Sequence, residues 1–379
     1  MSEQMNVAFD KLKNMDESTS IFALSVLNII VILIAFMVYF YYTGSIFSKG
    51  LMERDCKLMT EIYGEKNNRI NNVTNKDTLE YTLKDFYIKS AYNACSGGNY
   101  KNDYVDTCVL KTLIKQGVRG LDFEIFSIND EPVVATTTNE SFCVKETFNY
   151  VPFGEVLSIL QQNAFTSSTC PNPEDPLIIH LRIKSTNTKM INALTNLLAG
   201  FQKTTGRLLG PEFSYSKKNL SNIQLKDLQG KVILIVDGTN KFFIETLFDE
   251  YVNMLSSSSA MRALRYNDIK YTPDMDELVR FNMLGMTIGL PDKGASPANP
   301  SSILMREYGC QMLALRYQVI DSNIEENNIF FDDVGHAFVL KPEDLRYKKI
   351  VVKTTEQKTV VDYSKRVLET VIPGANFEI

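Results

Sequence analysis

The strongest hydrophobic signal in the chain lies near its N-terminus. No charged residue occurs between Glu17 and Lys49, and the run Ile21–Tyr42 is almost entirely apolar. As a helix, this run spans about 33 Å, which is enough to cross the hydrocarbon core of a bilayer. It ends in four aromatic residues, 39–42, a pattern typical of a membrane interface. The pattern predicts a single-pass transmembrane helix over 21–42, preceded by a polar tail over 1–20.

Two other readings of this run are a cleaved signal peptide and a buried core helix. The run is too long for a signal peptide and lacks a small-x-small exit, and core helices of this length usually carry charges. Basic residues flank it on both sides: Lys11 and Lys13 before it, and Lys49, Arg54 and Lys57 after it. The positive-inside rule slightly favours a cytoplasmic C-terminal portion. Sequons at Asn72, Asn139 and Asn219 would matter only if that portion were lumenal, so the orientation stays open.

Beyond the apolar run, residues 43–76 are polar and rich in asparagine, which predicts a stalk with one short helix. Short aliphatic strands then alternate with helical segments. The expected strands are Tyr81–Ser90, Val118–Phe126, Val133–Val134, Leu177–Ile183, Lys231–Asp237, Gly285–Gly289 and Met312–Val319. The expected helices are Val105–Gln116, Phe153–Asn163, Lys189–Gln202 and one within Asp274–Phe281. This alternation predicts one α/β barrel over 77–350, followed by a C-terminal extension over 351–379 that begins beside a strand-like KIVVKTT.

Composition narrows the function classes. The net charge of −5 gives no reason to expect a nucleic-acid partner. Six cysteines show neither a CxxC pair nor a metal-binding spacing, so we expect buried thiols rather than a disulfide framework. Only two histidines are present, His180 and His336, which limits any mechanism that needs two imidazoles.

Candidate chemistry is concentrated in the stretch Gly117–Thr138. Asp122 and Glu124 lie two residues apart on an expected strand, so both side chains leave by the same face. Two carboxylates at the end of a strand suit a metal site or an acid/base site. After the second short strand, where such a site would place a histidine, the chain has three threonines at 136–138.

Two groups of motifs follow one another between residues 84 and 346. The first group is DFYIKSAYN, GVRGLDFEIF with EPVV, PLIIHLRI and LKDLQGKVILI; the second is LVRFN, GCQMLALRYQ and GHAFVLKPEDLR. In this order they resemble the X and Y halves of the catalytic barrel of eukaryotic phosphoinositide-specific phospholipase C. The resemblance implies a TIM-type (β/α)8 barrel. It excludes the N-terminal anchor, and the accessory lipid-binding domains and the long insert between the halves have no counterpart in it.

The resemblance also implies a site, which this sequence alters at most positions. The family's two histidines fall on Tyr92, in Ser-Ala-Tyr-Asn, and on Thr136. The positions that hold calcium in the family are occupied by Asn93, Asp122, Glu124 and Arg182, the last a reversal of charge. The positions that bind substrate phosphate or the inositol ring are occupied by Ile235, Asp237, Thr287, Ile288 and Leu290.

These replacements predict that catalysis is absent. Loss of one positioned acid or base costs about 10²–10⁴-fold, and neither Tyr nor Thr titrates near neutrality. His180 lies two residues before Arg182 on the same strand face, where we expect a core histidine with satisfied hydrogen bonds. We hypothesise that Arg182 pairs with Asp122, Glu124 or both and makes the site metal-independent. The alternative is that Arg182 points to solvent at the strand end.

The sequence therefore predicts a membrane-anchored, catalytically inactive phospholipase C-like protein that acts as a binding or structural module. Its expected partners are the bilayer, through 21–42, and proteins of a membrane-associated assembly, for which a virus particle is one candidate. No cofactor is expected. Two alternatives stay open: an active phosphoinositide phosphodiesterase with a rebuilt site, calcium-dependent or not, and a headgroup binder that does not hydrolyse. The missing lysine and arginine clamps argue against the headgroup binder.

Overall fold

The computed structural model describes residues 17–139, 141, 143–348, 367–369 and 376–378. The chain divides into two compact units, Met1–Arg346 and Tyr347–Ile379. In the second unit, β12 (Val367–Glu369) pairs antiparallel with β13 (Asn376–Glu378). The polar tail up to residue 16 and the KIVVKTT segment lie outside the described residues.

The first unit is built on eight parallel strands. Hydrogen bonds join them in the order β7 (Met254–Ser256), β6 (Val232–Asp237), β5 (Leu177–Ile183), β2 (Gly120–Ile128), β1 (Phe86–Ala91), β10 (Met312–Leu315), β9 (Met286–Leu290) and β8 (Met261–Arg265). The two strands that end this path, β7 and β8, lie against each other, so the sheet is a nearly closed barrel. The expected (β/α)8 fold is confirmed.

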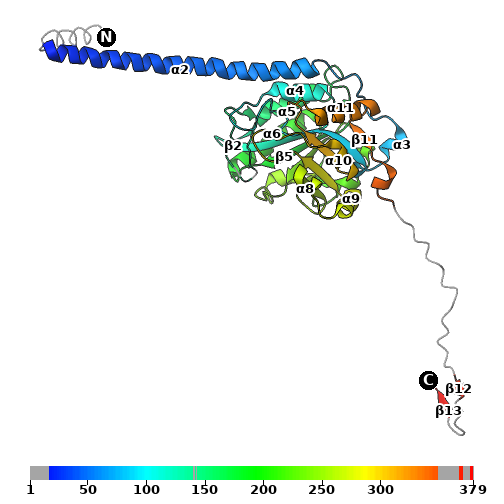
Figure 1. Cartoon of the computed structure of the whole chain (residues 1–379). Coiled ribbons are helices and arrows are strands. Elements are labelled where there is room, and N and C mark those ends of the chain that lie inside the picture. The colour runs from blue at the N-terminus through cyan, green and yellow to red at the C-terminus, as the bar shows by residue number, and fades with distance from the viewer. Residues whose placement is uncertain (1–16, 140, 142, 349–366, 370–375, 379) are drawn as a thin grey trace. The chain divides into compact units, whose positions relative to one another are not determined.

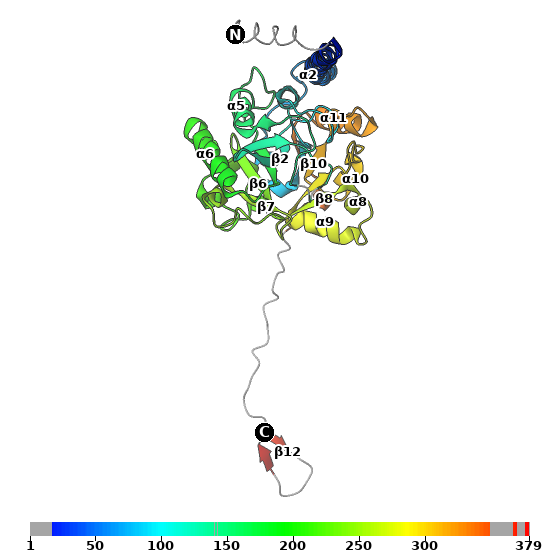
Figure 2. The same cartoon turned by 90° about the vertical axis from the view of Figure 1, so that its left-hand side faces the viewer.

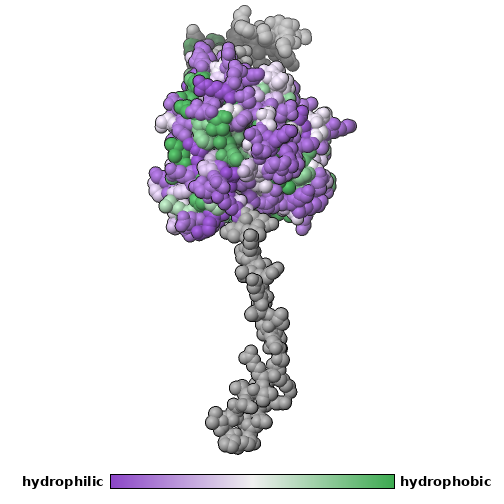
Figure 3. All heavy atoms as spheres, turned by 90° about the vertical axis from the view of Figure 1, so that its right-hand side faces the viewer, coloured by the Kyte–Doolittle hydropathy of each residue, from purple (hydrophilic) through white to green (hydrophobic). Residues whose placement is uncertain are grey.

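Helices surround these strands, as Figures 1 and 2 show. They are α3 (Lys76–Leu79), α4 (Thr107–Lys115), α5 (Phe153–Asn163), α6 (Thr188–Thr205), α7 (Leu225–Leu228), α8 (Tyr266–Lys270), α9 (Met275–Leu284), α10 (Ser302–Glu307) and α11 (Ser322–Val334). Single 3₁₀ turns are η1 (Leu83–Asp85), η2 (Pro211–Phe213), η3 (Leu220–Asn222), η4 (Leu247–Tyr251) and η5 (Glu343–Leu345). Figure 3 shows one face of the molecule, which is mostly hydrophilic with smaller apolar areas.

Three further strands extend the sheet outside the barrel path. β3 (Glu131–Ala135) pairs antiparallel with β2 and with β4 (Val151–Pro152). β11 (Phe338–Leu340) pairs antiparallel with β1. The β2–β3 pair matters for the site, because it brings the residues that follow β3 back over the carboxyl ends of the parallel strands.

Local polar contacts explain where elements start and stop. The expected strand Tyr81–Ser90 begins late because the Asp85 carboxylate accepts bonds from the Thr82 N–H and hydroxyl, which holds η1 as a turn. The expected strand Met312–Val319 ends early because the Arg316 N–H donates to the Asn299 side chain at 2.6 Å instead of to a neighbouring strand. The expected elements Phe153–Asn163 and Leu177–Ile183 have the expected bounds.

A single helix, α2 (Glu17–Tyr63), contains the apolar run and continues past it. Its 47 residues correspond to about 70 Å. The window Leu24–Tyr41 is apolar and long enough to cross a membrane, and none of it is buried in the protein. Figure 1 shows α2 as one unbroken helix.

The segment expected to be a stalk packs against the barrel. Met59, near the end of α2, is buried, and Ile70 and Val73 beyond it are buried as well. Cys56 of α2 forms a disulfide with Cys108 of α4, so the expectation of buried thiols is wrong for these two cysteines. It is also wrong for Cys143, whose thiol is free but exposed. The apolar residues within the asparagine-rich stretch are buried against the barrel, and this burial favours packing of the stretch over an extended linker.

Candidate functional site

The site lies where β1 and β5 end, beside the first half of the longer strand β2. Asp122 and Glu124 project from β2, Arg182 projects from the neighbouring β5, and Asn93 directly follows β1 and its flanking Tyr92. The parallel register of β2 and β5 places Glu124 opposite Arg182. All five side chains are buried, so their charges must be balanced within the protein.

Arg182 donates hydrogen bonds to three of these residues. Its Nε and Nη2 lie 3.0 and 2.7 Å from the two carboxylate oxygens of Asp122. Its Nη1 lies 2.5 Å from Oε1 of Glu124, and Nη2 also lies 2.9 Å from Oδ1 of Asn93. The hypothesised pairing with both acids is therefore present, and the alternative in which Arg182 points to solvent is wrong, since its side chain is 2 % exposed.

Tyr92 covers the guanidinium from one side. The centre of its ring lies 4.5 Å from the guanidinium carbon of Arg182, a cation–π distance. Nη1 of Arg265, at the end of β8, donates to the Tyr92 hydroxyl at 3.1 Å and to the Pro291 carbonyl at 2.6 Å. Tyr92 thus contacts two arginines, Arg182 and Arg265.

The ionisation of the cluster follows from these contacts. Burial by itself raises the pKa of Asp122, but Arg182 and His180 outweigh it and hold that pKa well below its usual range. For Glu124, burial dominates and raises the pKa of the carboxyl, although Arg182 opposes it. Burial lowers the pKa of Arg182, but Asp122, Tyr92 and Glu124 raise it further than burial lowers it. The result is a fixed cation paired most strongly with Asp122.

His180 is a fully buried histidine with both ring nitrogens engaged. Nδ1 lies 2.7 Å from Oδ1 of Asp122, and Nε2 lies 2.8 Å from the hydroxyl of Ser256 on β7. This is the satisfied core histidine that the strand position predicts. Its contacts hold Asp122 in place beneath Arg182.

The three threonines after β3 form hydrogen bonds with residues of other segments. The Thr136 hydroxyl donates to the Tyr100 carbonyl at 3.0 Å, and the Thr137 N–H donates to Oε2 of Glu124 at 2.8 Å. The Thr138 N–H and hydroxyl both donate to Glu146, at 2.7 and 2.6 Å. Burial raises the pKa of Glu146, but these bonds lower it to about 2 overall. Thr136, where the family resemblance predicts the loss of a second imidazole, therefore makes a hydrogen bond that joins two loops.

Little free space is left above the cluster. The cavity between Tyr92, Tyr100, Glu124, Thr137 and Arg265 has a volume of about 10 Å³, room for no more than one water. A neighbouring cavity of about 260 Å³ is lined by Cys143, Arg182, Ile183, Lys184, Ser185, Thr186, Asp237, Thr239 and Asn240. The most open cavity described, about 560 Å³, lies away from the cluster and is lined by residues of β1, α10, α11, β11 and η5.

The positions at which substrate contacts were predicted to be lost are buried in the core or bonded to neighbouring residues. Ile235, Ile288 and Leu290 are buried in the apolar core. The Thr287 hydroxyl donates to the Asn282 side chain at 2.6 Å. The Asp237 carboxylate accepts bonds from the N–H and hydroxyl of Thr239, which closes the turn after β6.

Sequence reasoning missed Arg265, because β8 was not recognised as a strand. The signal was the alternating run Met-Arg-Ala-Leu-Arg, in which the last residue reaches the barrel end. Ser256 was missed for the same reason, since β7 is only three residues long. Their contacts with the cluster depend on closure of the barrel.

Comparisons with known proteins agree with the fold. Residues 79–237 match the family model of the phosphatidylinositol-specific phospholipase C X domain. The fold is similar to L. pealei PLC21 (TM-score 0.56, 18 % identity, covering 71 % of this chain and 38 % of that one). It is also similar to S. officinalis PLC21 (TM-score 0.56, 18 % identity, covering 73 % and 40 %). The chain thus spans about two fifths of the length of these two proteins.

A calcium-dependent phosphoinositol-specific phospholipase C from a Gram-negative Pseudomonas species also matches, at a TM-score of 0.44 and 12 % identity, covering 72 % of this chain and 99 % of that one. No curated protein matches the chain. The resemblance to the phospholipase C catalytic barrel is confirmed for the fold and for the X-domain match. The correspondence of the second motif group to a Y half stays a prediction.

Proposed function

We propose that this chain is a membrane-anchored, catalytically inactive phospholipase C-like protein whose barrel acts as a binding or structural module. The observation that carries the proposal is the buried Arg182 guanidinium, which donates hydrogen bonds to side-chain oxygens of Asp122, Glu124 and Asn93. An arginine in this place uses the oxygens that a metal or a substrate would need.

Proton transfer has no evident carrier at this site. Tyr92 and Thr136 stand where the family resemblance expects the two imidazoles, and a phenol or an alcohol is a poor substitute for an imidazole in proton transfer near neutral pH. His180 is fully buried, with both nitrogens in hydrogen bonds. In-line attack on phosphorus needs both proton transfer and charge neutralisation. Arg182 supplies a fixed positive charge, and the Glu124 carboxyl, whose pKa burial raises, is held by Arg182 and the Thr137 N–H.

Calcium, which the fold family implies, does not fit the residues present. Calcium takes six to eight oxygen ligands, and here both carboxylate oxygens of Asp122 and Oε1 of Glu124 already accept from a guanidinium, while Oε2 of Glu124 accepts from the Thr137 N–H. A divalent cation would also lie against the positive charge of Arg182. We therefore derive no catalytic step through a metal.

The small volume of the cavity above the acids also supports an inactive site. Ligand sites in proteins usually enclose roughly 300–1,000 Å³, whereas the cavity above Asp122 and Glu124 has about 10 Å³. Side chains of Tyr92, Tyr100 and Arg265 fill the space.

Membrane anchoring rests on α2. Its apolar window, Leu24–Tyr41, is not covered by the rest of the protein, and burial in lipid is the favourable environment for such a surface.

The decisive test is hydrolysis of phosphatidylinositol and its phosphorylated forms by the full chain in lipid nanodiscs, with and without calcium. Asp122→Asn serves as the matched control, because it removes one charge with little change in shape. We expect the wild type and the control to be equally inactive. Turnover by the wild type that Asp122→Asn abolishes would establish the active phosphodiesterase instead.

A headgroup binder is a second candidate, favoured by the cavity of about 260 Å³ beside Arg182 and Lys184. Burial lowers the pKa of Lys184, and Arg182 lowers it further, which makes this a poor site for a stable second positive charge. Sedimentation with liposomes that contain phosphoinositides, compared with liposomes of phosphatidylserine at equal charge, separates this function from a purely structural one.

A further inference from the structure

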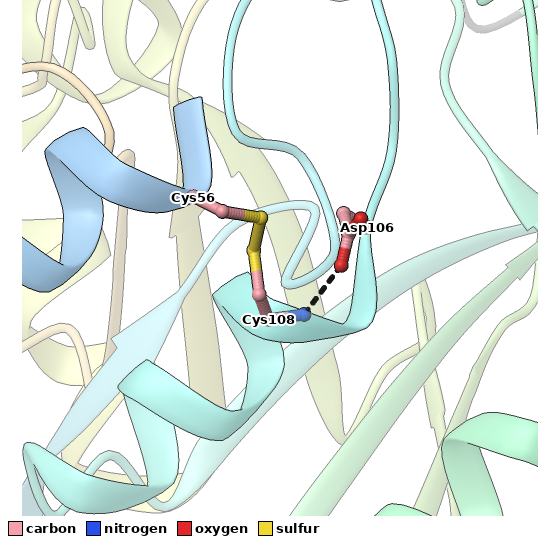
Figure 4. A group of neighbouring side chains, drawn as sticks. All are labelled: Cys56, Asp106 and Cys108. Atoms are coloured by element: carbon pink, nitrogen blue, oxygen red, sulfur yellow. Dashed lines mark hydrogen bonds between the residues drawn. A yellow bond between two sulfur atoms is a disulfide. The ribbon is translucent and has the colours of Figure 1, made fainter. Parts of the chain in front are cut away.

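The disulfide between Cys56 and Cys108 joins the membrane-proximal helix to the barrel. The two cysteines are separated by 52 positions in sequence, yet their Cα atoms lie 5.9 Å apart, within the normal range for a bridged pair. Figure 4 shows Cys108 in the first turn of α4, where its N–H donates to the Asp106 carboxylate at 2.7 Å. This cap fixes the start of α4, so the Cys108 side chain faces α2.

The three buried cysteines do not report on the redox environment. Cys95, Cys170 and Cys310 are buried, and burial raises the pKa of all three thiols, that of Cys310 to about 12. Such thiols react slowly in any compartment.

Cys56 and Cys108, by contrast, are only half-buried. A disulfide accessible to soluble reductants persists in oxidising compartments and is rare in the cytosol. The bridge therefore carries information about location that the buried thiols do not.

We propose that the barrel lies on the oxidising side of the membrane, with the N-terminal tail on the cytosolic side, and that Asn219 accepts an N-linked glycan there. This orientation is opposite to the one that the flanking basic residues slightly favour. Those charges are few on either side, whereas the disulfide is a specific covalent feature.

Asn219 is the best placed of the three sequons. It is exposed, and it begins the short turn η3, so its backbone is at the surface. The Ser221 N–H and hydroxyl both donate to its Oδ1, at 3.1 and 2.8 Å, so these bonds engage the oxygen of the amide and not Nδ2. Asn72 is half-buried, with its Oδ1 bonded to the Glu174 N–H, and Asn139 lies at the mouth of the filled cavity.

Both modifications balance chemically. Cys56 and Cys108 lose two protons and two electrons to the disulfide of a thiol oxidoreductase, which becomes a dithiol. At Asn219, Nδ2 forms a bond to the anomeric carbon of an oligosaccharide while the bond from that carbon to a polyprenyl diphosphate breaks. The amide proton is lost, and the diphosphate carries away the bonding electrons.

The first experiment counts thiols in the full chain expressed in eukaryotic cells. A Cys143→Ser background removes the exposed thiol, and cells are quenched in acid before denaturation and labelling with maleimide-polyethylene glycol. We expect three labelled cysteines before reduction (95, 170 and 310) and five after it. Five labels before reduction would overturn the proposal. A Cys56→Ser/Cys108→Ser variant, with three labels in both lanes, is the matched control.

The second experiment locates the glycan and the barrel. We expect an endoglycosidase-sensitive mobility shift that Asn219→Gln reduces by one glycan and Asn72→Gln leaves unchanged. In sealed microsomes, added protease should remove an N-terminal tag and spare the barrel. Digestion of the barrel would overturn the orientation. A protected barrel whose mobility Asn219→Gln does not change would overturn the assignment of Asn219.

Discussion

Arg182 is a buried cation whose position decides the character of the whole cluster. It is bonded to two carboxylates and one amide, and Tyr92 covers its face. Removing one partner of a buried ion pair lowers protein stability by far more than the pair itself contributes, because the remaining charge stays buried without a partner. The acids at 122 and 124 therefore depend on Arg182, which makes its replacement a sensitive probe.

Arg182→Met should destabilise the barrel by roughly 3–5 kcal/mol, since it leaves Asp122 and Glu124 unpaired. Arg182→Lys keeps the charge but loses the planar fork that bonds both oxygens of Asp122, so its cost should be smaller. Urea unfolding of the purified chain measures both. Equal, small effects for the two variants would mean that the cluster tolerates an unpaired acid, contrary to the geometry.

Lys341 gives a second prediction at this scale. Its side chain is buried, with Nζ 3.1 Å from the Asn282 carbonyl, and burial lowers its pKa to about 7. The unfolded chain therefore binds more protons than the native protein between about pH 7 and the ordinary lysine pKa, so stability rises with pH in that window. The slope from this one group is at most about 1.4 kcal/mol per pH unit.

Lys341→Met should remove that contribution. The free energy of unfolding of the wild type should therefore rise relative to that of the variant as the pH increases from 7 to 8.5. Urea midpoints at several pH values test this prediction. A constant difference across the window would mean that Lys341 is charged in the native state. Cys310 faces Lys341, and burial raises its pKa to about 12, whereas in the unfolded chain it titrates at about pH 8.5. Because Cys310 is present in both proteins, this contribution cancels in the difference between wild type and variant.

At the scale of elements, the contact between β1 and β2 sets a strict limit on side-chain size. Ser90 lies opposite Gly120 in this pair. A methyl group on Gly120 would collide with the Ser90 hydroxyl and lie 2.8 Å from its Cβ. Gly120→Ala should cost about 1–3 kcal/mol through overpacking. Adding Ser90→Gly should recover part of the loss in thermal unfolding, and a double variant no more stable than Gly120→Ala would place the strain elsewhere.

The disulfide between α2 and α4 permits a prediction for the junction of anchor and barrel. Closing a loop of 52 residues stabilises the native state by at most about 4 kcal/mol in the chain-entropy account. Cys56→Ser/Cys108→Ser should lower the thermal midpoint of the barrel, and reduction of the wild type should lower it equally. A variant that melts like the oxidised wild type would show that packing of Met59 alone holds α2 in place.

The elements that could be predicted from the sequence were those with long apolar runs. β5 and α5 were expected at their observed bounds, because each carries its own periodic signal. β7 and β8 were not expected, since three- and five-residue strands become recognisable only when the barrel closes around them. The same reason explains why Arg265 was missed while Arg182 was found. The Cys56–Cys108 pairing was missed because two half-cysteines 52 positions apart leave no local pattern.

At the scale of the whole molecule, the replacements that the family resemblance predicts are spread over the barrel. The two positions where it expects imidazoles lie after β1 and β3, Arg182 lies on β5, and the apolar residues at expected phosphate positions lie on β6 and β9. Catalysis in such a barrel needs groups from several strands held in one geometry. Restoring a single residue should therefore have no effect on activity.

A triple variant, Tyr92→His/Thr136→His/Arg182→Glu, tests this reasoning. It returns both imidazoles and the acidic character of the metal position, but Ile235, Ile288 and Leu290 still offer no contact to a phosphate. Arg182→Glu brings a third carboxylate beside Asp122 and Glu124, so we expect calcium to raise the thermal midpoint of the variant and not that of the wild type. We nevertheless expect no hydrolysis of phosphatidylinositol above the Asp122→Asn background. Calcium-dependent turnover by the triple variant would mean that the substrate pocket is intact, and that the barrel lost its activity only through these three positions.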